Sequence, residues 1–263
     1  MLIGNALAPL LGFANVGGIQ STDEIYYLLV VQNIGMFLLP AYLATRLVHR
    51  HALTRLGLAH KAKILSSLFV VGLAVSILPF ISFTAALNAL VPFPDWIVAM
   101  EKSAADLTNQ LLFTDQWEYF GLNLLVMAAM PALVEEIFFR GFLQNLVHRW
   151  TKNAHWAIFV TALIFSAFHL QFISFLPRLL LGIILGYLFY WSGSLWLSVI
   201  AHFVNNAMGI CVYFYVKYNQ LPFNPDAIDA AMQSNTLIAI ASAVTAGLLL
   251  NCIFQVERTK IKR

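Results

Sequence analysis

The sequence predicts an all-α fold, a polytopic bundle of transmembrane helices, and three observations lead to this prediction. First, 60% of the 263 residues are hydrophobic and only 10% are charged, whereas soluble domains average about 45–50% apolar and about 25% charged residues. Second, long charge-free runs approach or exceed the ~20 residues that cross a bilayer. Third, basic residues are concentrated in a few connections between these runs. This composition excludes a soluble domain.

The charge-free runs, taken in order, predict seven spans. They cover 25–45, 64–94, 119–134, 153–177, 179–216 and 230–256. The fifth run is long enough for two helices, and we expect it to break at Ser192-Gly193-Ser194. The expected spans are therefore 25–47, 64–90, 119–149, 155–173, 177–191, 194–217 and 236–256. Residues 1–20 are apolar and glycine-rich but contain no lysine or arginine, so we expect an N-terminal half-span or re-entrant segment and no cleavable signal peptide.

The distribution of basic residues predicts the topology. Short loops rich in lysine and arginine stay on the cytoplasmic side of a membrane. Three groups of basic residues fall on one side when the chain is threaded through seven spans: Arg46, Arg50, Arg55, Lys61 and Lys63; Arg149 and Lys152; and Arg258, Lys260, Lys262 and Arg263. The connections at 91–118 and 218–235 are more acidic and are expected outside. We therefore expect a multi-pass plasma-membrane protein with a cytoplasmic C terminus, and we favour a prokaryotic source because no organelle-targeting segment is visible.

Two adjacent glutamates make the third span unusual. Glu135 and Glu136 lie in an otherwise apolar run that ends at Arg140, and a charge inside a membrane costs at least ~2.5 kcal/mol per group. Residues four apart share a helix face, so Glu136 and Arg140 are expected to form an ion pair. Glu135 points elsewhere and is the better candidate for a catalytic base. The alternative is that all three form only a structural ion-pair network.

Two later spans place imidazoles where they can approach Glu135. Phe165 and His169 are four residues apart on the fourth span, and His202 and Asn206 are four apart on the sixth. Counting ~1.5 Å per residue from the expected cytoplasmic ends puts the polar groups at overlapping depths, roughly 12–22 Å. Either histidine alone would more often be a hydrogen-bonded core residue, and Phe165 is expected to serve packing. Together the groups predict one buried chamber.

Such a chamber has the groups needed to hydrolyse a peptide bond. A carboxylate and an imidazole can activate a water molecule, and a second imidazole with an asparagine amide can donate hydrogen bonds to the developing oxyanion. No Gly-x-Ser-x-Gly motif occurs, and neither Cys211 nor Cys252 is a sequence neighbour of a histidine, so no serine or cysteine nucleophile is indicated. Water is therefore the expected nucleophile.

These residues resemble the three signature motifs of the CPBP family, also called Abi, which contains CAAX prenyl proteases and bacteriocin-processing or immunity enzymes. The motifs are Glu135-Glu136-x-x-x-Arg140, Phe165-x-x-x-His169 and His202-x-x-x-Asn206. The resemblance covers about 119–217, which we take as the catalytic core. Residues 1–118 would supply N-terminal membrane helices and an external loop, and 218–263 an external loop, a last span and a basic tail, all in one integral membrane domain.

The resemblance implies an intramembrane endopeptidase. The residue matching Glu135 activates water with help from the one matching His169, and those matching His202 and Asn206 stabilise the oxyanion, while Glu136, Arg140 and Phe165 support them. Its partners would be a peptide or membrane-associated protein substrate and the lipid bilayer. No nucleic-acid partner is indicated.

The cofactor and two other functions remain open at this point. The family is commonly labelled metalloprotease, and Glu135, His169 and His202 form an alternative zinc ligand set. We expect no required cofactor and no metal, because the sequence has no His-Glu-x-x-His motif. A proton-coupled transporter would also bury acids and histidines, but it would need a pathway open to both faces. A noncatalytic membrane scaffold with a protease-like bundle is the third reading, although a scaffold does not require these buried groups.

Overall fold

The computed structural model describes residues 22–48, 54, 56–221 and 235–261, and every element in this part of the chain is helical. The all-α prediction is therefore confirmed. The half-span or re-entrant segment predicted at 1–20 lies outside the described residues, as do Arg50, Arg55, Lys262 and Arg263 of the predicted basic groups.

The helices follow one another along the chain with short connections. The first continuous helix contains α2 (Thr22–Gln32), the π-helical η2 (Asn33–Leu38) and α3 (Leu39–Val48). Next come α5 (Ile64–Ser76), α6 (Leu78–Ala89) and α7 (Asp95–Leu112). A long helix combines α8 (Trp117–Asn123), η3 (Leu124–Ala129), α9 (Met130–Glu136), η4 (Ile137–Gln144) and α10 (Asn145–Thr151). It is followed by α11 (Ala154–Phe168), α12 (Phe175–Ser192), α13 (Leu195–Tyr218) and α15 (Thr236–Ile261).

The described residues contain five or six candidate membrane crossings, whereas seven were predicted. Five of the described helices are long and apolar enough to cross a bilayer, and a sixth crossing results if α5 and α6, which are bent by 42°, count as one span. The remaining candidate, α11, has 15 residues. It was expected to reach residue 173 but ends at Phe168, because Leu170 adopts a left-handed φ of 52°. The count of seven is thus not confirmed.

Proline residues account for breaks and wide turns that the sequence analysis did not place. The expected span 64–90 is divided between α5 and α6, where Pro79 follows the break. Proline lacks the N–H donor, and its ring clashes with the carbonyl four residues earlier. Pro40 and Pro131 are each the second residue of an α-helix that directly follows a six-residue π-helical segment. In both places the wider turn accommodates the proline without ending the helix.

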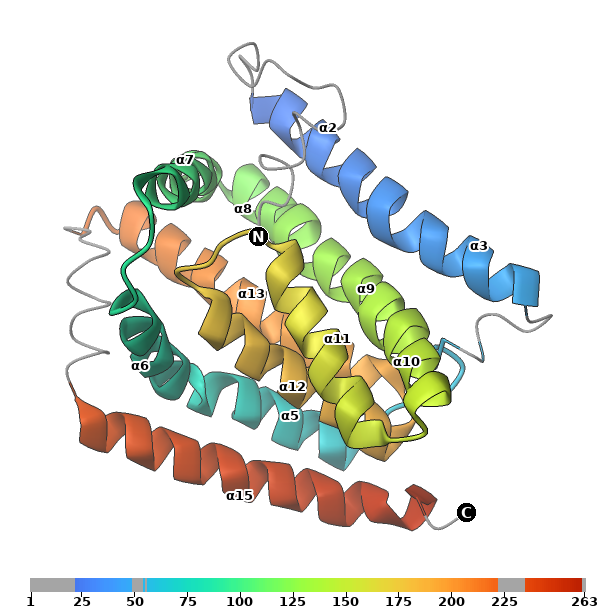
Figure 1. The fold of residues 1–263 in the computed structure, drawn as a ribbon. Coiled ribbons are helices and arrows are strands. Elements are labelled where there is room, and N and C mark those ends of the chain that lie inside the picture. Colours follow the sequence, from blue (N-terminus) through green and yellow to red (C-terminus); the bar gives the residue numbers. More distant parts are fainter. Residues whose placement is uncertain (1–21, 49–53, 55, 222–234, 262–263) are drawn as a thin grey trace.

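The long central helices lie between two flanking ones. In Figure 1 the α2–α3 helix (blue) and α15 (red) lie on opposite sides of the molecule, with α8–α10, α11, α12 and α13 between them. The turn between α12 and α13 comes where the sequence predicted it, at Gly193, which has a φ of 61°. The connection at 91–118, predicted as an external loop, instead contains the 18-residue helix α7.

One end of the bundle collects the basic connections. The main-chain N–H of Leu195 donates to the Gly57 carbonyl at 3.1 Å, and the Ser194 hydroxyl donates to the His60 carbonyl at 2.5 Å. Lys63, at the start of α5, forms an ion pair with Glu257 near the end of α15 (3.5 Å). The predicted basic groups at 61–63 and near the end of α15 therefore lie at the same end of the molecule.

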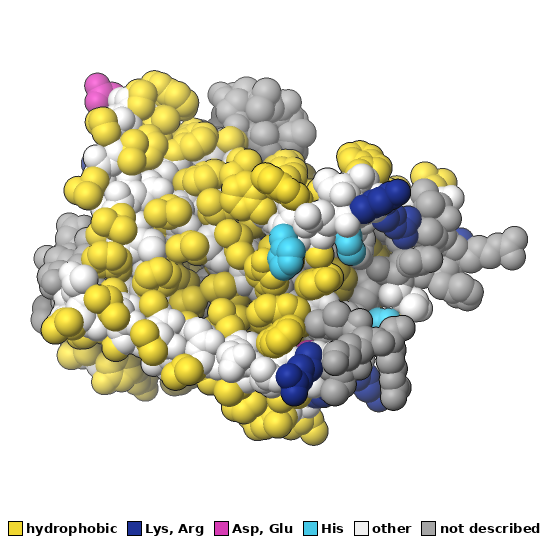
Figure 2. Space-filling view, turned by 60° about the horizontal axis from the view of Figure 1, so that its bottom comes forward, with side chains coloured by type: hydrophobic (Ala, Val, Ile, Leu, Met, Phe, Trp, Pro, Cys, Tyr) yellow, Lys and Arg dark blue, Asp and Glu magenta, His cyan; other side chains and the backbone are white. Residues whose placement is uncertain are grey.

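The outer surface is that of a protein embedded in lipid. Figure 2 shows a broad face of hydrophobic side chains, with lysine, arginine and histidine side chains gathered toward one edge. Leu47, Ile64 and Leu237 are at least 78% exposed, and large contiguous apolar surfaces are unusual on soluble monomers. Several spanning-length apolar helices with such a surface make this a multi-pass membrane protein.

Candidate active site

One cavity brings together the residues that the three motifs predicted. It has a volume of about 300 Å³, and its lining includes Glu135, Phe165, His169, His202 and Asn206. These side chains come from α9, from α11 and its C-terminal end, and from α13. The convergence of three separate helices was the structural expectation of the sequence analysis, and the geometry agrees with it. Glu136 and Arg140 do not line the cavity and lie behind it, fully buried.

The expected ion pair between Glu136 and Arg140 is present. Arg140 Nη1 donates to Glu136 Oε1 at 3.0 Å, and neither side chain is exposed. Arg140 Nη2 donates to the Gly182 carbonyl at 3.1 Å, which connects this helix to α12. Burying a guanidinium is costly unless its charge is paired. Glu136 pairs the charge and the Gly182 carbonyl binds a second nitrogen, whereas Nε has no hydrogen-bond partner among the described groups.

The same Glu136 oxygen also holds His202, a contact that the sequence analysis missed. His202 Nδ1 lies 3.0 Å from Glu136 Oε1, and His202 Nε2 lies 4.0 Å from Glu135 Oε2. Because a carboxylate oxygen can only accept, Nδ1 carries the hydrogen in this contact. The ring is therefore oriented with Nε2 toward Glu135. The two residues are 66 positions apart, and no local pattern indicates such a contact.

His169 is oriented by a similar arrangement at the end of α11. Its Nδ1 lies 2.8 Å from the Phe165 carbonyl oxygen. A carbonyl oxygen also only accepts, so Nδ1 is the donor and Nε2 has the free lone pair of the neutral ring. The early end of α11 places His169 at the helix terminus, followed by a short loop at 169–174. Both histidines of the cavity thus have Nδ1 hydrogen-bonded, and within the described part of the chain the only polar contact of either Nε2 is that of His202 with Glu135 at 4.0 Å.

Phe165 packs at the centre of these groups. Its ring centroid lies 4.9 Å from that of His169 and 5.9 Å from that of His202, both in edge-on geometry. The Arg140 guanidinium carbon lies 4.6 Å from the same ring centroid, a favourable cation–π distance. Phe165 is 1% exposed. Its position fits the packing role predicted for it, because it fixes the spacing of both imidazoles and the arginine.

Two glycines on α12 allow the helices of the site to approach closely. A Cβ atom at Gly186 would lie 2.8 Å from Ile158 Cγ2 and 3.0 Å from Gln144 Oε1, and one at Gly182 would lie 3.0 Å from Ala162 Cβ. Gln144 Nε2 donates to the Gly186 carbonyl at 3.1 Å, as Arg140 does to Gly182. This small-xxx-small spacing brings membrane helices into contact. The close approach of α12 lets the Gly182 carbonyl hold Arg140, which in turn holds Glu136.

The sequence analysis also missed polar residues of the cavity wall. Asn109 of α7, Gln171 of the 169–174 loop, Arg178 of α12 and Asn205 of α13 line the same cavity. Arg178 was visible as the charge that separates two apolar runs, but it was taken as lying at a span boundary. Because α12 begins at Phe175, Arg178 lies in the first turn of this helix.

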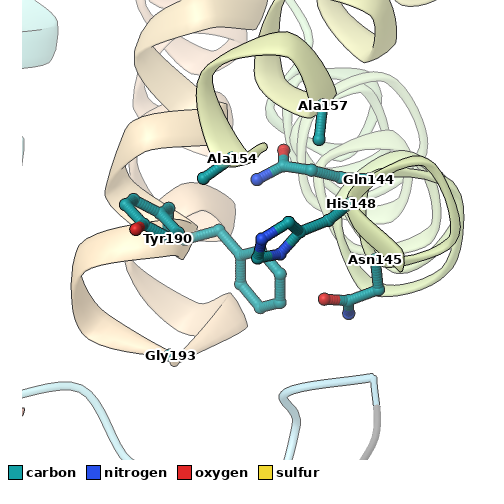
Figure 3. A pocket seen from close by; sticks show the side chains of 8 residues that line it. Gln144, Asn145, His148, Ala154, Ala157, Tyr190 and Gly193 are labelled. Atoms are coloured by element: carbon teal, nitrogen blue, oxygen red, sulfur yellow. The ribbon is translucent and has the colours of Figure 1, made fainter. Parts of the chain in front are cut away.

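A second, smaller cavity of about 140 Å³ lies away from the motif residues. Figure 3 shows Gln144, Asn145 and His148 facing Tyr190 and the turn at Gly193. None of the predicted catalytic residues lines it. Glu135, His169 and His202 line the larger cavity and not this one, so the larger cavity is the candidate active site.

The alternative zinc ligand set does not assemble as a metal site in this structure. Within the described part of the chain, no three His, Cys, Asp or Glu side chains come together in a way that would hold a metal ion. Glu135 and His202 approach each other to 4.0 Å, but no third ligand completes the group. The residues as arranged here do not fit the three-ligand geometry of a catalytic zinc.

Comparisons with known proteins point in the same direction as the motifs. Residues 117–208 match the family model described as type II CAAX prenyl endopeptidase Rce1-like. The chain is 29% identical over 93 residues to the uncharacterized protein YpbD of Bacillus subtilis (strain 168), an alignment that covers 34% of this chain and 44% of YpbD. The chain thus spans less than half the length of that curated relative. No solved structure matches the chain.

The matched segment contains all three motifs, from Glu135 through Asn206. Residues 117–208 of this membrane protein are therefore similar to the Rce1-like type II CAAX prenyl endopeptidases, in agreement with the resemblance that the three motifs indicated.

Proposed function

We propose that this protein is an intramembrane endopeptidase of the CAAX protease type. The observation that carries the proposal is the cavity itself, where a carboxylate, two oriented imidazoles and an amide from three helices meet inside a membrane protein. The family match over the same segment supports a protease of this class. A transporter or a scaffold accounts for buried charges in general, but neither requires the two histidines to present Nε2 to one cavity.

In the proposed mechanism Glu135 and His169 activate water. The Glu135 carboxylate accepts a proton from a water molecule that His169 Nε2 helps to hold, and the resulting hydroxide attacks the carbonyl carbon of the scissile peptide bond. Glu135 then delivers the proton to the leaving amine as the C–N bond breaks. Glu135 Oε2 accepts no hydrogen bond from a described protein group, so it is available for this exchange.

His202 and Asn206 are proposed to stabilise the oxyanion. The side-chain amide of Asn206 can donate a hydrogen bond to the oxyanion through its N–H. Its Oδ1 accepts a long hydrogen bond of 3.5 Å from Asn205 Nδ2. Since His202 Nδ1 already donates to Glu136, donation to the oxyanion requires that Nε2 also carry a hydrogen. The role therefore needs an imidazolium lying between the carboxylates of Glu135 and Glu136. Two such donors in a water-poor site commonly lower the barrier by several kcal/mol.

Metal dependence follows from the same proposal. We propose a mechanism without a required metal, with Glu135 as the base. Purified protein treated with a strong chelator should then keep its full cleavage rate, and metal analysis should find less than one equivalent of zinc. Loss of activity on chelation that zinc alone restores would contradict the metal-free mechanism and favour the alternative in which Glu135, His169 and His202 bind zinc.

The substrate class is proposed from the family description and the location of the cavity. A membrane-associated protein or peptide, with a prenylated C-terminal segment as in the family's name, can reach a cavity between lipid-facing helices. Membrane proteomes of cells that carry either the wild type or Glu135→Gln should differ by cleaved fragments present only with the wild type. Identical fragment sets would remove the support for a protease.

A further inference from the structure

Arg178 places a positive charge in the wall of the candidate active site. It lies in the first turn of α12, is half-buried and lines the cavity together with Glu135 and His169. No carboxylate lies within 4.0 Å of its guanidinium in the described part of the chain. The fully buried Arg140, in contrast, is paired with Glu136.

The guanidinium is fixed in place by neutral acceptors. Its Nη1 donates to the Gln171 carbonyl at 3.0 Å, and its Nη2 donates to the Gln171 side-chain oxygen. A guanidinium has five N–H donors in a rigid fork, so three remain uncommitted. An arginine with free donors beside a cavity is suited to bind a planar anion through two parallel hydrogen bonds.

The loop that holds Arg178 is itself anchored at several points. Asn88 Nδ2 donates to the Phe172 carbonyl at 2.9 Å, and its Oδ1 accepts from the Leu176 N–H at 3.0 Å. The Ile173 N–H donates to Glu101 Oε1 at 2.7 Å. Because α6 and α7 both fix this loop, little conformational entropy is lost when Arg178 binds a ligand. The same loop begins at His169, which links the cation to the proposed water-activating group.

We propose that Arg178 is a specificity-determining residue that binds the C-terminal carboxylate of the substrate. The inference rests on the proposed protease function. The backbone of a peptide is neutral, so an anionic group must come from its C terminus or from an acidic side chain. A cavity of about 300 Å³ is at the small end for ligand sites and holds few residues beyond the cut. A carboxylate bound there belongs to a terminus that lies close to the scissile bond.

The charge arrangement supports this direction of binding. Glu135 lines the same cavity and repels a second carboxylate. Arg178 lies close enough to Glu101, Glu135 and His169 to interact electrostatically with them, although neither carboxylate is within 4.0 Å of its guanidinium. The attraction of Arg178 and the repulsion of Glu135 would together hold a bound carboxylate close to Arg178 and away from Glu135. The carbonyl of a bond a few residues upstream is then presented to Glu135 and His169.

The test compares two probes that differ only in the charge at the terminus. Both are internally quenched peptides with a prenylated cysteine followed by three residues, one with a free C-terminal carboxylate and one with a C-terminal amide. For the full-length wild type in vesicles we expect kcat/KM to be about 10- to 100-fold higher for the acid, mainly through KM, as charge-assisted hydrogen bonds predict. Arg178→Gln should abolish the preference for the acid, so that the value for the acid falls by a larger factor than the value for the amide.

Two further variants control the comparison. Arg178→Lys keeps the charge but not the bidentate fork, so it should retain part of the preference for the acid. Lys102→Gln removes an exposed charge from α7 without altering the cavity wall and should leave both probes unaffected. If Arg178→Gln does not fold, as judged by thermal unfolding, the preference of the wild type and of Arg178→Lys decides the question.

The outcomes separate this inference from the function on which it rests. Equal cleavage of acid and amide by the wild type would overturn the carboxylate site and leave the protease intact. An Arg178→Gln variant that loses the same factor on both probes would show that Arg178 acts through Glu135 or the loop and not on the substrate. Failure of the wild type to cleave either probe would overturn the proposed function and this inference together.

Discussion

Glu136 determines the geometry of the site although it does not line the cavity. Its Oε1 accepts hydrogen bonds from both Arg140 and His202, each at 3.0 Å, and its side chain is fully buried. The carboxylate therefore neutralises the guanidinium and fixes the direction of the imidazole ring at the same time. A role in positioning, and not in contact with the substrate, follows from this placement.

Replacing Glu136 by alanine should destabilise the protein. Removing one partner of a buried ion pair leaves an unpaired charge, which typically costs about 3–5 kcal/mol. We expect a clear loss of thermal stability in detergent for Glu136→Ala. The double variant Glu136→Ala/Arg140→Met should recover part of this loss, because it no longer buries a lone guanidinium. Unchanged stability of the single variant would mean that the ion pair contributes nothing to the fold.

Only part of this residue-level geometry could be predicted from the sequence. The pairing of Glu136 with Arg140 follows from helical spacing, because residues four apart meet on one face. The contact between Glu136 and His202 depends on how two distant helices pack, and helical spacing carries no information about that. The catalytic roles of Glu135, His169, His202 and Asn206 remain predictions.

At the scale of the elements, close packing between α11 and α12 brings the groups of the site together. Gly182 and Gly186 face Ala162 and Ile158, and their carbonyls accept from Arg140 and Gln144. The absence of side chains at these two positions allows polar side chains of η4 to reach the backbone of α12. The site depends on this helix spacing as much as on its own residues.

Adding a single methyl group at Gly186 should disturb this packing. A Cβ atom there would lie 2.8 Å from Ile158 Cγ2, and overpacking of this kind costs about 1–3 kcal/mol. Gly186→Ala is therefore expected to lower the unfolding temperature in detergent and reduce cleavage. The matched control is Gly209→Ala on α13, where nothing lies within 4 Å of the new atom and helix propensity favours alanine. Equal stability of the two variants would contradict the close approach.

Element boundaries were predictable where a local signal marked them. The break at Ser192-Gly193-Ser194 was placed correctly because serine and glycine interrupt a run that is too long for one crossing. Hydropathy alone did not reveal that Pro79 divides a span, that α11 ends at Phe168 or that 95–112 is helical. These features depend on backbone geometry and tertiary packing, to which average hydrophobicity is insensitive.

At the scale of the whole molecule, the charge distribution defines two ends. The 57–63 connection, the α12–α13 turn and the end of α15 are joined by hydrogen bonds and by the ion pair of Lys63 with Glu257. Positively charged connections favour the cytoplasmic side. We therefore propose that this end faces the cytoplasm and that α7 lies toward the opposite face.

Cysteine labelling tests this orientation. The two native cysteines are first replaced by Cys211→Ser and Cys252→Ser. A cysteine that then replaces Lys61 or Lys152 should react with a membrane-impermeant reagent only after the cells are opened. A cysteine at Lys102 on α7 should react in intact cells. If the cysteines that replace Lys61 and Lys102 were labelled from the same side of the membrane, the proposed topology would be contradicted.

The most direct test of the central claim is cleavage of a prenylated, internally quenched peptide by purified protein in vesicles. The wild type should cleave it, and Glu135→Gln should lower the rate by about 10²–10⁴-fold, the usual contribution of a general acid–base group. Glu257→Gln is the matched control, because Glu257 is also a buried glutamate but lies outside the cavity, and it should retain the wild-type rate. Full activity of Glu135→Gln, or equal loss in both variants, would contradict the assignment of this cavity as the active site.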